Sequence, residues 1–322
     1  MPFQVVPATG AVLEQVLADT YALWNDGLSR DSYGKAWAAQ LKTPWGQSHL
    51  DRVALMDGPH VMCSAKRYDL SLRLDGRIRR ALGIGAVFTP PAHRGRGAAR
   101  ELIARVLDTA VTEGQEFAVL FSEIAPAFYE RLDFVPVPLI ESTFEVDQKR
   151  GGAPAVLVRS GDAKDLPWIV EMSAARSAAA RLTLDRNEDF IRYAITKKRL
   201  MSGLAPIGTR TTEFLVVEEG HQAVAYLVCT EEGGRWMIEE CGDRDPAGAR
   251  LGAMLQVMLA RHPSERLPEI KGWWPHAYMP PQMKVVASTP TESVLMIRPL
   301  RDRILPLPLA AAEVVYWHAD YF

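Results

Sequence analysis

The sequence predicts an α+β protein made of two tandem units, each of which contains both strands and helices. Over residues 3–146 the apolar periodicity predicts a strand, two helices, three strands, a helix, a strand, a helix and two strands. Residues 155–299 predict nearly the same order of elements, which indicates an internal repeat. Between these two repeats, residues 149–154 are rich in glycine and basic residues, a composition typical of a linker. We therefore expect domains at 1–148 and 155–300, a linker at 149–154 and a tail at 301–322.

In the first repeat, two dipeptides mark tight hairpin turns. Asp57-Gly58 and Asp75-Gly76 are favoured where both central residues need positive φ, so they predict a three-stranded meander. The expected strands are 3–7, 52–57, 60–74, 77–88, 117–122 and two strands within 134–146, and the expected helices are 12–24, 32–41, about 98–112 and 125–131.

In the second repeat, the order of elements is similar although the letters differ. The expected strands are 155–159, 214–218, 223–230, 236–241, 269–273 and 293–299, and the expected helices are 166–180, 189–201 and 247–261.

Composition narrows the class of protein. The 322 residues carry a net charge of −2, so no global field favours nucleic acid. Cys63, Cys229 and Cys241 are far apart and form no CxxC pair, which indicates neither a metal site nor a disulfide framework. There is no signal-peptide pattern at the start and no apolar run long enough for a membrane span. We expect a cytoplasmic protein without nucleic-acid or membrane partners; a homo-oligomer stays open.

The segment His93-Arg94-Gly95-Arg96-Gly97-Ala98-Ala99-Arg100 predicts a phosphate-binding turn. It follows an apolar strand and opens a helix whose apolar residues recur every three or four positions. Glycine lets backbone amides turn toward a ligand, and a helix N-terminus adds unpaired N–H groups and positive dipole charge. Together these features favour a phosphate group.

Two motifs resemble the GCN5-related N-acetyltransferase (GNAT) superfamily. Arg94 to Ala99 matches its acetyl-CoA-binding pattern Arg/Gln-x-x-Gly-x-Gly/Ala, and Phe128-Tyr129 to Phe134 resembles its FYxxxGF segment, with Asp133 in place of glycine. The spacing of roughly 30 residues between the motifs also fits. The resemblance implies, for each repeat, a mixed, mainly antiparallel sheet flanked by helices. It also implies an N-acetyltransferase that uses acetyl-CoA as co-substrate, acts on a primary amine of a small molecule or a protein, and needs no metal.

The second repeat lacks the acetyl-CoA pattern. Near its equivalent position stand Asp243 and Asp245, which would repel a pyrophosphate and are typical of a helix cap rather than a metal site. One working copy followed by a degenerate copy resembles the enhanced-intracellular-survival type of acetyltransferase. Members of that group usually carry a further sterol-carrier-like domain, for which this sequence is too short.

The resemblance implies roles for particular residues. The pyrophosphate of acetyl-CoA is expected on the turn and helix start, the pantetheine arm along the preceding strand, and the backbone N–H of Val87 on the thioester oxygen. The expected acetyl-CoA-binding residues are Val87, Phe88, Thr89, Arg94, Gly95, Arg96, Gly97, Ala98, Ala99 and Arg100. Tyr129 is the expected general acid, with an ordinary core tyrosine as the alternative.

The aromatic tail and the first helices complete the expected site. In the resembled group the terminal carboxylate serves as base, and Phe322 would supply it here; the alternative is a tail that only packs. Trp24, Asp26 and Trp37 are candidates for binding a cationic amine acceptor. The competing interpretation of the whole chain is a non-catalytic acyl-CoA-binding or regulatory module.

Overall fold

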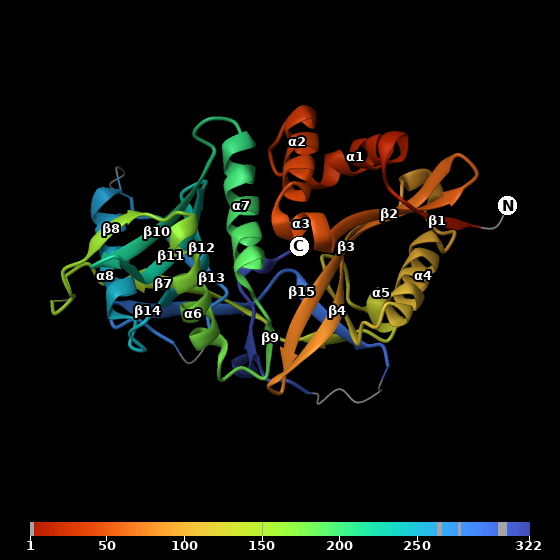
Figure 1. Ribbon diagram of the computed structural model, residues 1–322. Coiled ribbons are helices and arrows are strands. Elements are labelled where there is room, and N and C mark those ends of the chain that lie inside the picture. The colour runs from red at the N-terminus through yellow and green to blue at the C-terminus, as the bar shows by residue number, and fades with distance from the viewer. Residues whose placement is uncertain (1–2, 150, 263–265, 276–277, 302–307) are drawn as a thin grey trace. The chain divides into compact units, whose positions relative to one another are not determined.

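The computed structural model describes residues 3–149, 151–262, 266–275, 278–301 and 308–322. The chain forms two compact units (Figure 1). The first combines the segment up to Val137 with Glu292–Leu309 and Phe322; the second combines Pro138–Thr291 with Ala310–Tyr321.

The first unit is built on a mixed sheet with the strand order β1-β2-β3-β4-β5-β15-β6. All neighbouring pairs are antiparallel except β4 and β5, which are parallel. The strands are β1 (Gln4–Pro7), β2 (Leu50–Asp57), β3 (His60–Leu74), β4 (Arg77–Phe88), β5 (Phe117–Ser122), β6 (Val135–Val137) and β15 (Val294–Pro299). The helices are α1 (Gly10–Trp24), α2 (Arg30–Leu41), α3 (Pro44–His49), α4 (Ala98–Thr112) and α5 (Ala127–Glu130).

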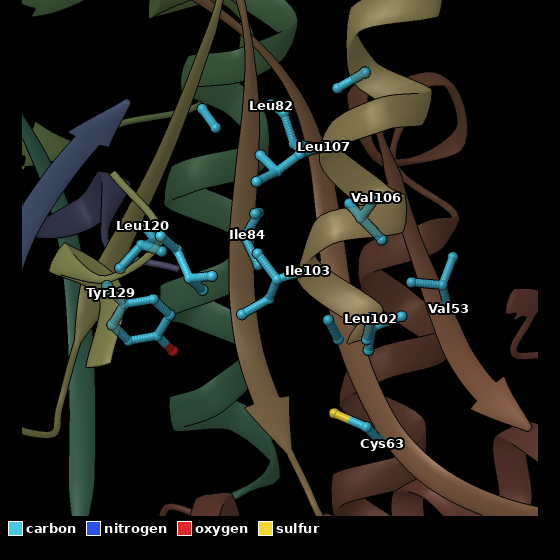
Figure 2. Close-up of a cluster of buried hydrophobic side chains, with 14 of the residues drawn as sticks. Val53, Cys63, Leu82, Ile84, Leu102, Ile103, Val106, Leu107, Leu120 and Tyr129 are labelled. Atoms are coloured by element: carbon cyan, nitrogen blue, oxygen red, sulfur yellow. The ribbon is translucent and has the colours of Figure 1, made fainter. Parts of the chain in front are cut away.

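Helix α4 covers one face of this sheet. Its buried residues, including Leu102, Ile103 and Val106, recur at helical spacing and pack on Val53 of β2 and Ile84 of β4 (Figure 2). Because side chains alternate along a strand, the residues next to these in β2 and β4 face away from α4. The sheet therefore has one face closed by α4 and a second face whose residues matter for the site.

The second unit also has a mixed sheet, with the order β14-β7-β13-β12-β11-β10-β8. The strands are β7 (Ile140–Val146), β8 (Leu157–Ser160), β10 (Arg210–Glu219), β11 (Gln222–Glu232), β12 (Arg235–Asp243), β13 (Glu269–Gly272) and β14 (Met283–Pro290), with β9 (Leu182–Leu184) paired to β16 (Val314–Val315). The helices are α6 (Leu166–Ser177), α7 (Glu188–Leu204) and α8 (Ala249–Arg261). Two mixed sheets flanked by helices confirm the predicted α+β class.

Two strands lie in a different sheet from the one that the expected domain boundaries give them. Strand β7, expected in the first domain, pairs with β13 and β14 in the second unit. Strand β15, expected in the second domain, pairs with β5 and β6 in the first unit. Periodicity identifies a segment as a strand but carries no information about its partner, so an exchange of strands was invisible in the sequence.

Besides the two-residue strand β16, which is too short for a pattern, three elements were absent from the expectation. Helix α3 is only six residues long and is set by its ends: Thr43 caps it and Pro44 occupies its first turn. Strand β14 lies at a sheet edge and is exposed along all but its first residue, so it lacks the alternation that marks a strand. Strand β9 has three residues, too few for a pattern.

The tail expected at 301–322 is divided between the units. Residues 302–307 lie outside the described residues. The turns η3 (Ala311–Glu313) and η4 (His318–Asp320) belong to the second unit and Phe322 to the first. Among the helices of the described residues, none is both long and apolar enough for a membrane crossing.

Candidate active site

Strand β4 separates from β5 before either strand ends. Their parallel register runs from Ala81–Phe117 to Ile84–Leu120, whereas β4 continues to Phe88 and β5 to Ser122. Opposite β3, the register of β4 shifts by one residue, and Ala86 adopts a φ of +47°. An inserted residue of this kind bends a strand and increases its twist. The bulge therefore turns the last residues of β4 away from β5 and frees backbone groups that face the gap.

The glycine turn follows directly after this bulged strand. Gly95 and Gly97 have φ values of +75° and +78°, a conformation that side chains disfavour, and Gly97 is the N-cap of α4. The first intrahelical bond there runs from the N–H of Glu101 to the carbonyl of Gly97, which leaves the preceding amides of α4 without a helical partner. Arg94 donates from Nε to the carbonyl oxygen of Thr89 at 3.1 Å.

The charge around the turn is positive and open to solvent. Arg94, Arg96 and Arg100 are exposed, as are Gly95 and Gly97, while Ala98 is buried against the core. Free amides, a helix dipole and three guanidinium groups in one exposed turn suit the pyrophosphate of a coenzyme A thioester. The predicted cradle residues thus lie together in space, at the carboxyl end of β4.

Tyr129 on α5 points into the core of the first unit, beside Leu120 (Figure 2). Its ring packs edge-on against Phe128 at 4.9 Å and Phe134 at 6.1 Å. Burial raises the pKa of its phenol to about 12, and nearby Cys63 and Glu123 add to the shift. The phenol therefore keeps its proton at neutral pH, as a proton donor must.

The predicted acceptor residues occupy different environments. Trp24 packs against Phe88 at 6.0 Å between ring centroids and donates from Nε1 to Glu123 at 3.1 Å, so it stands beside the end of β4. Asp26 is exposed in the turn after α1, with a φ of +47°. Trp37 on α2 is only 5% exposed, and contact of its ring with an acceptor stays a prediction.

Phe322 lies against the face of the sheet opposite α4. Its ring contacts Tyr68 at 4.6 Å and Phe121 at 5.6 Å between centroids. A Cβ atom on Gly85 would stand 3.3 Å from the main-chain carbonyl carbon and oxygen of Phe322. The main-chain carboxyl group of Phe322 is therefore next to the bulge of β4. Gly85 was missed by the sequence reasoning, since nothing in the sequence shows that a distant segment packs on it.

In the second unit, α8 corresponds to α4, and a side chain of the protein binds the amides at its N-terminus. At the start of α8, a carboxylate oxygen of Asp243 accepts the N–H groups of Arg250 and Leu251, each at 3.0 Å. Asp243 is 1% exposed, and burial raises its pKa. An internal carboxylate thus takes the amides that a phosphate would need, which confirms the predicted helix cap.

The strand that corresponds to β4 in the second unit is also covered. The pairing of β12 with β13 stops at Ile238–Gly272, and a register shift against β11 sets Glu239 in a bulge. The η4 turn packs on β12, where Glu239 binds His318 at 2.6 Å and Lys198 at 2.8 Å. The second unit therefore repeats the bulged strand, but Asp243 closes the start of the helix that follows it.

In the first unit, a bulged strand that splays from its neighbour is followed by a glycine turn that opens a helix. Residues 14–137 match the family model described as Acetyltransferase (GNAT) domain. This match covers the segment that contains the glycine turn and most of the first sheet. The two mixed sheets have the fold of a solved tandem GNAT protein.

Solved structures support the fold over almost the whole chain. A GCN5-related N-acetyltransferase from Anabaena variabilis is 13% identical, with a TM-score of 0.69 and coverage of 93% of this chain and 73% of the other. Eis1 from Mycobacterium abscessus is 13% identical, with a TM-score of 0.56 and coverage of 93% and 74%. A tandem GNAT protein from the clavulanic acid biosynthesis pathway is 14% identical, with a TM-score of 0.52 and coverage of 94% and 99%. Among curated proteins, no sequence matches.

Proposed function

We propose that the protein is an N-acetyltransferase that moves an acetyl group from acetyl-CoA to a primary amine by direct attack. The observation that carries this proposal is the grouping, in the first unit, of the glycine turn, the bulged end of β4 and a protonated Tyr129. The second unit serves as a structural partner, since Asp243 closes its phosphate position.

The donor side supplies position and charge. The exposed turn around Gly97 would hold the pyrophosphate on the amides of α4, with Arg94 and Arg96 neutralising its charge. The thioester would then lie along the splayed part of β4, where the backbone N–H of Val87 is suited to stabilise negative charge on the thioester oxygen. Most of the rate gain would come from holding thioester and amine in line.

Two groups would move protons. As the amine nitrogen bonds to the carbonyl carbon, the carbon–sulfur bond breaks and the sulfur takes a proton from the phenol of Tyr129. The amine loses its proton to a base, for which we propose the main-chain carboxylate of Phe322, because it lies beside Gly85 and hence beside the reacting end of β4. Solvent then restores the phenol and the carboxylate.

The test is release of free coenzyme A thiol with a panel of primary amines. The wild-type chain should release thiol with at least one amine, and a Phe322 deletion or a short C-terminal extension should lower kcat while the Kd for acetyl-CoA stays unchanged. Unchanged kcat in both altered chains would exclude the carboxylate as base. Such a result would leave the transfer reaction itself in place.

The second candidate is a non-catalytic acyl-CoA-binding module, favoured by the burial of the Tyr129 ring among core side chains, as in an ordinary core tyrosine. It predicts tight binding of acetyl-CoA with no thiol release for any amine. Isothermal titration beside the thiol assay separates the two functions.

A further inference from the structure

The proposed reaction makes no use of Arg52, a buried cation on β2. Arg52 is 4% exposed, and its Nε and Nη1 atoms are buried and have no hydrogen-bond partner among the residues that the structure describes. Within the described ranges, no carboxylate forms an ion pair with it. A buried guanidinium that lacks both an anion and hydrogen-bond acceptors is costly, because it has lost its water without replacement.

A tryptophan lies against this cation but does not satisfy it. The Cζ atom of Arg52 is 4.8 Å from the ring centroid of Trp37, a cation–π contact. A ring face attracts the charge, yet it leaves the N–H groups in the guanidinium plane without acceptors. Among the described residues, the indole Nε1 of Trp37 is also buried without a hydrogen-bond partner. Two nitrogen donors of Arg52 and one of Trp37 therefore lie close together without an acceptor.

The strand register places these donors on the face of the sheet where the proposed reaction occurs. Arg52 pairs with Lys66 of β3, and Lys66 pairs with Gly85 of β4, so the three positions form one row on one face. The two rows on either side of it, one with Val53 and the other with Ile84, pack in the core with α4. Arg52 therefore faces away from α4, in the row that ends at the residue touching Phe322.

The same row carries a second positive charge. The Nζ atom of Lys66 is 5.6 Å from the ring of Trp37, and Lys66 stands directly opposite Arg52 across the strand pair. Like charges at directly opposite positions destabilise a sheet. An anion that binds near Arg52, Lys66 and the ring of Trp37 would reduce this repulsion and would therefore be favoured. Lys66 and Phe322 are only half-buried, so this face is open to solvent beside them.

We propose that Arg52 and Trp37 bind a carboxylate of the acceptor, so that the acceptor is an amine that also bears a carboxylate, as amino acids do. This inference rests on the proposed function and specifies its substrate class. A carboxylate is the ligand because its planar oxygens match guanidinium N–H groups and can also accept the indole N–H. Arg52 thereby acts as a specificity residue that orients the acceptor amine.

The test compares ligands that differ by one carboxylate. Thermal melting of the protein saturated with coenzyme A is measured with lysine against cadaverine and with ornithine against putrescine. In the wild type, the amino acid of a pair should raise Tm more than its decarboxylated partner. This difference should vanish in Arg52→Gln and persist in Arg79→Gln, a matched change at a cation paired with Glu116.

Kinetics give a second readout. Where both members of a pair are acetylated, Arg52→Gln should lower the ratio of their kcat/KM values at least tenfold. The variant Trp37→Phe keeps an aromatic six-membered ring but removes the pyrrole ring with its Nε1 donor. It leaves Arg52 in place, so it should give a smaller loss, and it remains available if Arg52→Gln does not fold.

Two results overturn the inference: no carboxylate-dependent shift in the wild type with either pair, or a shift that Arg52→Gln and Trp37→Phe both leave intact. Arg52-dependent carboxylate binding without thiol release from any amine would support the site and refute the proposed transfer, so the two failures are distinguishable.

Discussion

Replacing Tyr129 with phenylalanine removes the proposed proton donor and little else. The ring, which packs between Phe128 and Phe134, is retained, and only the hydroxyl is lost. We therefore expect kcat to fall about 10²-fold, the lower end of the range for general acid catalysis, with Tm and the Kd for acetyl-CoA nearly unchanged.

The expected size follows from the two pKa values involved. The phenol of Tyr129 has a pKa of about 12, and a free thiol has about 8.5. Complete transfer of the proton to a thiolate is thus uphill by about 3.5 units, or about 5 kcal/mol. The phenol contributes by partial proton transfer while the sulfur leaves, which explains a loss at the lower end of the range.

The assay is thiol release under saturating acetyl-CoA and amine from pH 6 to 10.5, with Tyr278→Phe as control. Tyr278 is a buried tyrosine of the second unit whose hydroxyl has no partner among the described residues, so its loss should leave kcat unchanged. A Tyr129→Phe variant with wild-type kcat would refute the role. The role would also be refuted if the kcat of the wild type decreased at high pH with an apparent pKa near 10 and the kcat of Tyr129→Phe did not.

Three further outcomes are expected. Gly97→Ala forces a side chain into a φ of +78°, at about 1–2 kcal/mol, and should weaken acetyl-CoA binding in a titration more than it lowers Tm; a purely structural turn would show the reverse. Asp243→Ala should lower the unfolding free energy by about 2 kcal/mol in urea titrations without changing the Kd for acetyl-CoA, and a changed Kd would mean that the second unit binds it. In acid the protein should lose stability as the pH falls through 6.5 and then 4.5, with Tm measured by calorimetry from pH 8 to 4. Burial and Lys198 lower the pKa of His318. Burial raises the pKa of Glu239, but Lys198 and His318 outweigh burial and hold this pKa far below its usual range. In acid the unfolded chain therefore binds more protons than the folded chain, and a Tm that does not change with pH would contradict this.

Local sequence was sufficient to predict the glycine turn and the elements on either side of it. The turn from Arg94 to Gly97 and the segment around Tyr129 are contiguous, and their chemistry depends on backbone conformation within a few residues. Their expected flanking strand and helix are β4 and α4. The hairpin turns at Gly58 and at Asp75-Gly76 were also local and are present, with positive φ at each of these residues.

Features that depend on distant partners could not be predicted. Arg52 looks like an ordinary charged residue of a strand, and only the register that aligns it with Lys66 and Gly85 shows that it is buried beside Trp37. The bulge at Ala86 is similar, because an alanine at a φ of +47° gives no signal in the sequence. The packing of Phe322 on Tyr68 joins positions at opposite ends of the chain.

The exchange of β7 and β15 has a consequence for biosynthesis. The first sheet needs β15, whose residues Val294–Pro299 emerge from the ribosome long after β5 and β6. Until then β5 lacks its antiparallel neighbour and presents an open edge, a hazard for aggregation during translation. A fragment cut at residue 148 would lack that strand for the same reason and would carry β7 without its partners. We therefore expect that neither half of the chain folds alone. Split or truncated versions should be cut so that β7 and β15 stay with the strands they pair with, rather than at the boundary of the sequence repeat.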